Sequence, residues 1–163
     1  MICYRQANLE DLERIWDYNM AMDPEEPRMT RWRESYITRN KEGRAATFVA
    51  VIEGEPVGEV TLDFHAEACG NPRIRDCLAD GKTMAYVTAL RIRPEFEGRG
   101  YISGLMRFAE AAARQRGYTS LSIGVEAAET RNLSIYLHWG YDRFLTCESD
   151  GGELVLFYAK TLQ

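Results

Sequence analysis

The sequence predicts an α/β (α+β) fold in a single domain, with a mixed, mostly antiparallel central sheet of about seven strands flanked by about four helices. Two-residue and 3.6-residue apolar periods alternate along the chain in the order β-α-α-β-β-β-α-β-α-β-β. That order combines hairpins, which are antiparallel, with one β-α-β crossover, which is parallel. A length of 163 residues suits one domain with its own core, and no repeat, low-complexity segment or linker divides residues 1–163.

The first half of the chain predicts three strands and two helices. Asn8, followed by acidic residues, is typical of a helix N-terminus, and apolar residues then recur at helical spacing together with Asn19. Two prolines within 23–27 end that helix. Two β-rich segments flank Glu53-Gly54-Glu55, which is typical of a hairpin turn. The predicted elements are a strand at 2–5, helices at 9–22 and 30–41, and strands at 45–52 and 56–64.

The second half begins with a polar segment, 65–81, which contains Gly and Pro and is predicted to be a loop. A helix follows the first strand, and its inward side is predicted to carry Ile102, Leu105, Met106, Ala109 and Ala112. The predicted elements are strands at 82–93 and 120–126, helices at 100–116 and 131–139, and strands at 142–147 and 152–161.

Composition and charge exclude several functional classes. With 45% apolar and 28% charged residues, the chain is typical of a globular protein rather than a disordered one. A net charge of −5 argues against a general nucleic-acid binder, which needs a basic surface. Residues 91–116 nevertheless hold six Arg against three Glu, so this stretch is +3 and the remainder is −8. Some of these charges fit a solvated helix face, with Glu110 and Arg114 as an i,i+4 pair.

Metal-binding and membrane-spanning motifs are absent from the sequence. The four cysteines form no Cys-x-x-Cys pair, and only two histidines could join them, so no metal site is predicted. No apolar run approaches the roughly 18 residues of a membrane span. The first residues lack the basic region and apolar run of a signal peptide. We therefore expect a cytoplasmic protein with reduced thiols and no membrane partner.

A glycine-rich turn between a strand and a helix is the most informative feature of the chain. Glu97-Gly98-Arg99-Gly100 follows the strand that ends near Arg93 and opens the helix at 100–116. Free backbone N–H groups and the positive end of a helix dipole favour phosphate at such a place. The Gly-Lys-Ser/Thr ending of a Walker loop and the Gly-x-Gly-x-x-Gly dinucleotide pattern are both absent. The turn therefore indicates a different phosphorylated cofactor.

Two segments together resemble one known family. Residues 90–106, Leu-Arg-Ile-Arg-Pro-Glu-Phe-Glu-Gly-Arg-Gly-Tyr-Ile-Ser-Gly-Leu-Met, resemble the coenzyme A loop of the GNAT superfamily of N-acetyltransferases. Asn132 through Tyr141 resembles that family's Asn-x-x-Ala-x-x-Leu-Tyr-x-x-x-Gly-Phe segment. Glu97 stands where the family usually has Arg or Gln, and Ile102 where it usually has Gly or Ala. The element order is also that of the family, so the resemblance extends over nearly the whole chain and implies a GNAT-like fold.

The resemblance implies acetyl-CoA as the acetyl donor and coenzyme A as the bound cofactor. Backbone groups of the strand before the loop would pair with the pantetheine amides, and the loop would hold the pyrophosphate. Asn132 would position the cofactor, although capping of its helix is an equally good interpretation. The implied cofactor-binding residues are Leu90, Arg91, Ile92, Arg93, Gly98, Arg99, Gly100, Tyr101, Ile102, Ser103 and Asn132.

Catalytic roles follow from the same match. Tyr136 occupies the position of the family tyrosine that donates a proton to the thiolate, a task that suits a phenol because it is protonated at neutral pH. The strand before the loop contains no acid, so the base has to come from elsewhere. Glu126, at the end of the neighbouring strand, is the first choice. Glu59, Asp63 and His65 come next, and a water relay without a dedicated base also fits.

The implied function is transfer of an acetyl group from acetyl-CoA to a primary amine of a small molecule. Two alternatives stay open: acetylation of a protein or peptide amino group, and a non-catalytic acyl-CoA-binding module. The acceptor should lie against the first two helices and the 65–81 segment, where several acids would suit a cationic amine. These acids are Asp23, Glu25, Glu26 and Glu67. Homodimerisation is left open.

Overall fold

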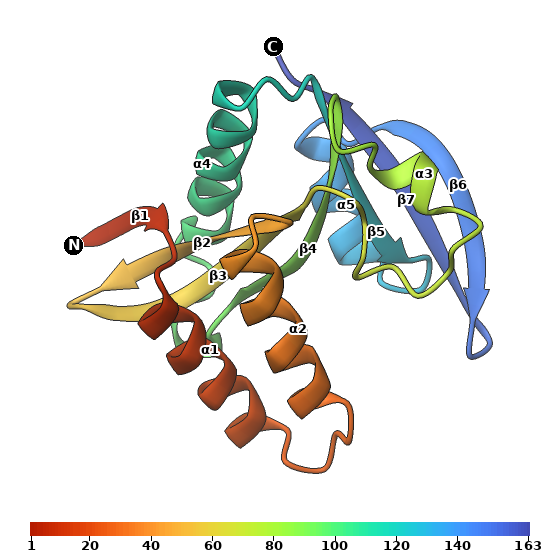
Figure 1. Ribbon diagram of the computed structural model, residues 1–163. Helices are drawn as coiled ribbons and strands as arrows, with labels where there is room; N and C mark the ends of the chain where they lie inside the picture. The colour runs from red at the N-terminus through yellow and green to blue at the C-terminus, as the bar shows by residue number, and fades with distance from the viewer. The chain divides into compact units, whose positions relative to one another are not determined.

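The computed structural model describes residues 1–163 and contains every predicted strand and helix (Figure 1). The strands are β1 Ile2–Gln6, β2 Ala45–Ile52, β3 Glu55–Asp63, β4 Met84–Ile92, β5 Ser120–Glu126, β6 Arg143–Asp150 and β7 Glu153–Thr161. The helices are α1 Leu9–Met22, α2 Met29–Lys41, α3 Arg75–Leu78, α4 Tyr101–Gln115, α5 Thr130–His138 and a 3₁₀ turn at Pro94–Phe96. The α3 helix and the 3₁₀ turn were not predicted from the sequence.

The strands form one seven-stranded mixed sheet, which confirms the predicted fold class. Their order is β1-β2-β3-β4-β5-β7-β6. β1 pairs antiparallel with β2, and β7 pairs antiparallel with both β5 and β6. The pairing of β4 with β5 is parallel, as expected for strands joined by a helical crossover. The last strand, β7, therefore lies between β5 and β6 rather than at the edge of the sheet.

The chain divides into two compact units. Unit 1 consists of residues 1–61 and 89–109, and unit 2 consists of residues 62–88 and 110–163. The β3 and β4 strands and the α4 helix each contribute residues to both units. The interpretation of residues 1–163 as a single domain stays a prediction.

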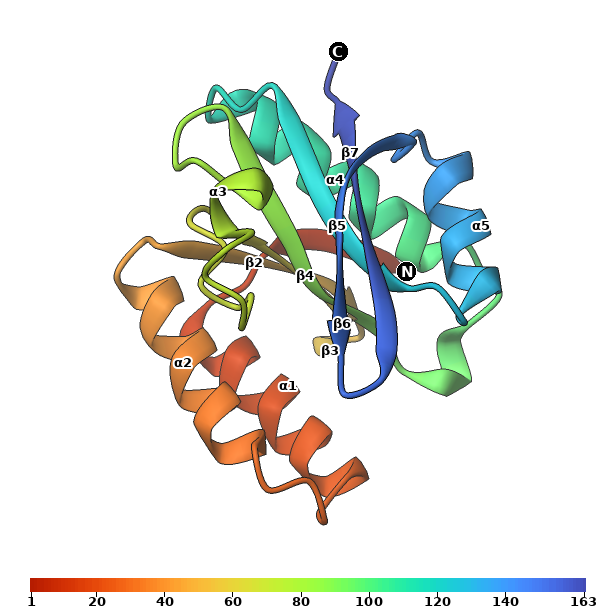
Figure 2. The same cartoon turned by 90° about the vertical axis from the view of Figure 1, so that its right-hand side faces the viewer.

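In unit 1, α1 and α2 lie side by side in both views (Figures 1 and 2). Asn8 and Asp11 form the capping box of α1, in which each side chain accepts a hydrogen bond from the other residue's backbone N–H. The buried ring of Trp16 then packs on that of Tyr36 in α2, with ring centroids 5.2 Å apart. This packing orients α1 so that its inner side carries Asn19 as well as apolar residues.

The first turn of α4 lies close to the side chain of Tyr4 in β1. An ideal Cβ added to Gly104 would stand 2.2 Å from the Tyr4 hydroxyl, so only glycine allows this approach. One turn further along, Phe108 meets the rings of Tyr4 and Phe48, at centroid distances of 6.4 Å and 5.8 Å. These contacts fix the start of α4, where the glycine-rich turn ends.

In unit 2, the prediction of a polar loop at 65–81 was wrong in part. Ala66, Cys69, Ile74 and Leu78 are buried in a core cluster with Phe157 of β7. The α3 helix provides Leu78, and the Ser122 hydroxyl donates a 2.6 Å hydrogen bond to the carbonyl of Leu78. The apolar residues in this segment follow neither a strand nor a helix period, so sequence periodicity could not identify them as core.

The β4 strand begins two residues later than predicted because Asp80 organises the preceding turn. Its carboxylate accepts hydrogen bonds from the backbone N–H groups of Lys82, Thr83 and Met84. Partial desolvation opposes ionisation, but these bonds outweigh it and hold the pKa of Asp80 well below its usual range.

The predicted surface pair of Glu110 and Arg114 was also wrong. Glu110 is only 6% exposed, accepts a 3.2 Å hydrogen bond from the Tyr141 hydroxyl, and binds Lys160 Nζ at 2.9 Å. The inward side of α4 carries Leu105, Met106 and Ala109 as predicted. Ala113 takes the fully buried place expected for Ala112. An i,i+4 spacing shows that two side chains lie on the same side of a helix, but not whether other elements of the fold bury that side.

No helix of this protein combines the length and the apolar character needed to cross a membrane.

Candidate active site

The glycine-rich turn at 97–103 has the backbone geometry of an anion-binding loop. Gly98 and Gly100 have φ values of +75° and +77°, in the left-handed region that glycine adopts without strain. No atom lies within 4 Å of a Cβ built on either glycine, so the space beside both is open. The α4 helix begins at Tyr101, directly after the second glycine.

The N–H groups of this loop have no acceptor within the protein. The preceding N–H groups of Phe96 and Glu97 bind the carbonyls of Arg93 and Pro94, and the next bond along the chain is from Gly104 to Gly100. The six N–H groups from Gly98 to Ser103 between them are left for water or a ligand. Such a row at a helix N-terminus fits a phosphate or pyrophosphate group.

The side chains around the loop are compatible with that ligand. Arg107 Nη1 donates a 2.6 Å hydrogen bond to Ser103 Oγ, which brings a cation to the first turn of α4. Arg99 lies over the ring of Phe96 at 5.6 Å. Glu97 is exposed and makes no ion pair with Arg93 or Arg99, so its carboxylate remains hydrated. Ile102, in the first turn of α4, is half-buried.

The β4 strand leaves regular geometry just before this loop. Its parallel pairing with β5 covers only Met84 to Val87. Two residues later, Ala89 has a φ of +53°, a value that residues other than glycine rarely adopt. The positive φ makes β4 irregular just ahead of Leu90, Arg91 and Ile92, which lead to the loop.

In unit 2, Tyr136 lines an open pocket of about 350 Å³, named here the Tyr136 pocket. Its lining includes Tyr86, Gly124, Glu126, Glu129 and Glu148. The hydroxyl of Tyr136 has no hydrogen-bond partner, and its ring lies 5.8 Å from that of Trp139. Burial, and secondarily the charge of Glu129, raise the pKa of Tyr136, so the phenol keeps its proton at neutral pH.

Asn132, from the second matched segment, and Glu126, from the end of β5, also lie in unit 2. Asn132 lies in the first turn of α5 and donates a 2.8 Å hydrogen bond to Glu129 Oε2. Glu129 is itself the N-cap residue, so the interpretation of Asn132 as the helix cap was wrong. Glu126 is exposed at the end of β5 and lines the Tyr136 pocket. The first-choice base and the proposed acid are therefore in one pocket.

Two of the remaining base candidates have structural roles. Asp63 is fully buried, and its carboxylate accepts hydrogen bonds from the backbone N–H groups of Ala68 at 2.7 Å and His65 at 3.3 Å. The ring of His65 lies against Gly81, where an added Cβ would stand 2.4 Å from its Cε1. These contacts stabilise the turn that follows β3.

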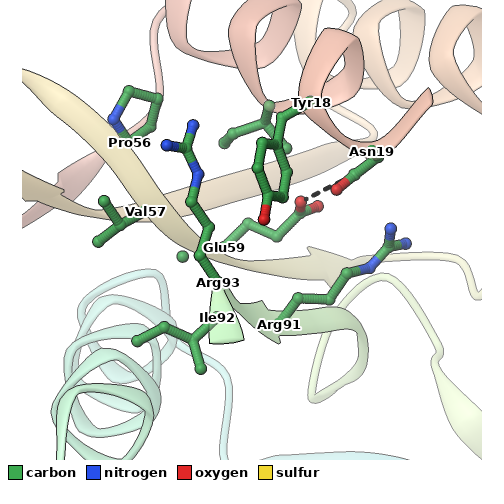
Figure 3. A pocket seen from close by; sticks show the side chains of 10 residues that line it. Tyr18, Asn19, Pro56, Val57, Glu59, Arg91, Ile92 and Arg93 are labelled. Carbon is green, nitrogen blue, oxygen red and sulfur yellow. Dashed lines mark hydrogen bonds between the residues drawn. The ribbon is translucent and has the colours of Figure 1, made fainter. Parts of the chain in front are cut away.

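The fourth candidate, Glu59, lines a separate cavity in unit 1, named here the Glu59 pocket, with a volume of about 90 Å³ (Figure 3). Glu59 is 3% exposed, and its Oε2 accepts a 3.2 Å hydrogen bond from Asn19 Nδ2. Its Oε1 has no hydrogen-bond partner. In Figure 3 the carboxyl group lies between the side chains of Arg93 and Arg91, beneath α1.

The walls of the Glu59 pocket include two arginines that lie on rings of α1. Arg93 stacks on Tyr18 at 4.2 Å and lies 3.7 Å from a carboxylate oxygen of Glu55. Arg91 lies over the ring of Trp16 at 5.3 Å and makes no ion pair or hydrogen bond. Tyr18 and Asn19 were not predicted from the sequence to be site residues. The available signal was Asn19, a polar residue within the apolar stripe of α1.

Comparison with known proteins decides the family. The model of the acetyltransferase (GNAT) family matches residues 7–158. The chain belongs to the acetyltransferase (GNAT) family. The family assignment confirms the resemblance seen in the sequence and the enzyme class, acyltransferase.

Solved structures of acetyltransferases share the fold over the whole chain. An N-acetyltransferase from Staphylococcus aureus Mu50 is 18% identical, with a TM-score of 0.70 and coverage of 100% of this chain and 99% of that one. A putative acetyltransferase from Salmonella typhimurium, solved with its cofactor acetyl-CoA, is 15% identical, with a TM-score of 0.73 and coverage of 100% and 95%. The PaiA N-acetyltransferase from Thermoplasma acidophilum, in complex with coenzyme A, is 18% identical, with a TM-score of 0.63 and coverage of 99% of both chains. No curated protein matched the sequence.

The buried carboxyl of this acetyltransferase gives a testable pH dependence of stability. Burial raises the pKa of Glu59 above its usual 4.5, although Arg91 and Asn19 act against the change. Below pH 4.5 the group is protonated in both folded and unfolded chains. As the pH rises through the folded-state pKa, ionisation costs the folded protein stability, so the neutral variant Glu59→Gln should become the more stable protein.

Thermal unfolding of both proteins between pH 4 and pH 8.5 measures this difference. The two midpoints should coincide at the acidic end, and the variant should unfold at a higher temperature at the basic end. A difference of about 1 kcal/mol moves the midpoint by about 2–4 °C in a chain of this size. A variant that is less stable than the parent at pH 8 would mean that Arg91 and Asn19 outweigh the cost of burial.

Proposed function

We propose that this acetyltransferase moves an acetyl group from acetyl-CoA to a primary amine of a small molecule. The observation that carries the proposal is the row of six N–H groups without acceptors at Gly98–Ser103, beside two glycines with positive φ. A phosphate or pyrophosphate satisfies such donors, and the two similar structures named above were solved with coenzyme A and acetyl-CoA.

The proposed cofactor roles follow the residues predicted from the sequence. The loop from Gly98 to Ser103 binds the pyrophosphate through its backbone, with Arg99 and Arg107 as nearby cations. Backbone groups of Leu90 and Ile92 bind the pantetheine amides. Arg91 and Arg93 belong to the same cofactor-binding segment, which leads into the loop. Asn132 orients the cofactor from the first turn of α5. When bound, acetyl-CoA supplies an acetyl group activated as a thioester.

The proton transfers are assigned to the Tyr136 pocket. A primary amine is neutral in only about one part in a thousand near pH 7.4, so a base that accepts its proton helps the reaction. Glu126 is proposed for that role. Tyr136 donates its hydroxyl proton to the departing thiolate sulfur. The support for Tyr136 is its raised pKa and a hydroxyl that no other group of the protein binds.

A small amine is preferred to a protein amino group, as predicted from the sequence. A panel of amines, assayed with acetyl-CoA by the release of free thiol, tests the function. Turnover would exclude the non-catalytic binding module, and the accepted amine would distinguish small molecules from peptides. Cytoplasmic location and homodimerisation stay predictions.

The phosphates of the cofactor should supply much of its affinity. Coenzyme A is expected to bind at least about tenfold more tightly than pantetheine, which lacks the phosphates, because each charge-assisted hydrogen bond contributes about 1.5–3 kcal/mol. Calorimetric titration of the full chain with each ligand measures the difference. Equal affinities would show that the loop at 97–103 holds no phosphate.

A further inference from the structure

The Glu59 pocket presents one negative and one positive side chain that lack ionic partners. Glu59 is the only acid in its lining, and Asn19 satisfies just one of its two oxygens. Arg91 makes only the contact with the Trp16 ring. The charged atoms of the two side chains form no ion pair, although the charge of Arg91 acts to lower the pKa of Glu59. A ligand can therefore occupy the space between them.

Arg93, the second arginine of the pocket, is already engaged by other groups of the protein. Arg93 already lies near Glu55 and stacks on Tyr18. Arg93 follows the end of β4 and lines the pocket together with Arg91, so it adds positive potential, which disfavours a purely cationic ligand such as a polyamine. The single carboxylate, on the other hand, disfavours a purely anionic ligand. The pocket is matched to a compact molecule that carries both charges.

From this arrangement we infer that the Glu59 pocket binds a small α-amino acid, with its amino group on Glu59 Oε1 and its carboxylate on the Arg91 guanidinium. A guanidinium binds a carboxylate through two parallel N–H···O bonds, and this fork gives both affinity and orientation. Ammonium donors suit Glu59 Oε1, a carboxylate oxygen that accepts no hydrogen bond within the protein and lines the pocket. The inference names a ligand of the Glu59 pocket and does not depend on the assignment of the proton transfers to the Tyr136 pocket.

Binding can be measured without any acetyl transfer. The full chain is titrated calorimetrically with each of the proteinogenic L-amino acids, and then with the decarboxylated and deaminated counterparts of the best ligand; for alanine these are ethylamine and propionate. We expect a dissociation constant in the millimolar range or below for the best amino acid. Both counterparts should bind at least about tenfold more weakly, since each lacks one of the two charged groups of the amino acid.

Variants assign the two ends of the ligand. Arg91→Gln should weaken binding of the amino acid at least tenfold and leave that of the amine counterpart unchanged. Glu59→Gln should weaken the amino acid and the amine but not the deaminated acid. Arg33→Gln, which removes a surface ion pair with Asp17 at 3.5 Å, is the matched control and should change nothing. Arg91→Lys keeps the charge without the fork and is tested if Arg91→Gln does not fold.

Titration with coenzyme A separates this inference from the proposed function. Binding of coenzyme A without a preference for any amino acid over its amine counterpart would overturn the inference and leave the function standing. If an amino acid binds and coenzyme A does not, the inferred ligand stands and the proposed function is overturned. An amino-acid preference that survives Arg91→Gln would also overturn the assignment of the carboxylate.

Discussion

Tyr136→Phe is expected to lower kcat by about 10²-fold while leaving coenzyme A affinity nearly unchanged. The substitution keeps the ring that packs near Trp139 and removes only the proton donor. General acid catalysis contributes about 10²–10⁴-fold, and a thiol with a pKa of about 8.5 leaves partly unaided, so the lower end of the range applies. Steady-state kinetics with the accepted amine measures kcat, and calorimetry with coenzyme A measures the affinity.

Stability distinguishes this role from an ordinary packing role. When a core tyrosine with a hydrogen-bonded hydroxyl is replaced by phenylalanine, the free energy of unfolding falls by about 1 kcal/mol. The Tyr136 hydroxyl has no such bond, so the unfolding temperature should hardly change. Tyr118→Phe is the matched control, because Tyr118 is also a partly buried tyrosine of unit 2, stacked on Phe64 at 5.2 Å. Equal turnover in the two variants would remove Tyr136 from the mechanism.

Gly100→Pro is expected to abolish coenzyme A binding, with a loss of at least about 10²-fold in affinity. Proline removes one of the six free N–H groups and fixes φ near −65°, whereas Gly100 has a φ of +77°. Both effects displace the N-terminus of α4 from its anion-binding geometry. Calorimetric titration with coenzyme A measures the loss, and circular dichroism verifies that the variant is folded.

Gly43→Pro is a suitable control because Gly43 has a similar φ of +72° and no atom within 4 Å of an added Cβ. It lies in the turn between α2 and β2, outside the loop. Gly43→Pro also breaks the 3.2 Å hydrogen bond from the Gly43 N–H to the carbonyl of Asn40, so it should lose at least as much stability as Gly100→Pro. Only Gly100→Pro should lose the cofactor. A folded Gly100→Pro protein with parental affinity would contradict the assignment of the loop.

The local signals in the sequence determined most of the fold. Apolar periods located all seven strands and the four long helices, and Asn8 marked the start of α1. Boundaries agree within two residues except for β6, which extends to Asp150. These features depend on residues close together in the chain, so a pattern of two or 3.6 residues is enough to identify them. The glycine-rich turn belongs to the same class, because backbone N–H groups at a helix start need no distant partner.

Tertiary structure alone decided where the polar side chains lie. Glu110 is spaced i,i+4 from the exposed Arg114, yet Glu110 is buried and bonded to Tyr141 and Lys160. Glu59 and Asn19 are 40 positions apart and meet only because α1 covers β3. The core role of 65–81 likewise depends on packing against Phe157. Sequence periodicity reports which side of an element is apolar, whereas the partner of a charged group is set by elements distant in the chain, and burial then determines its ionisation.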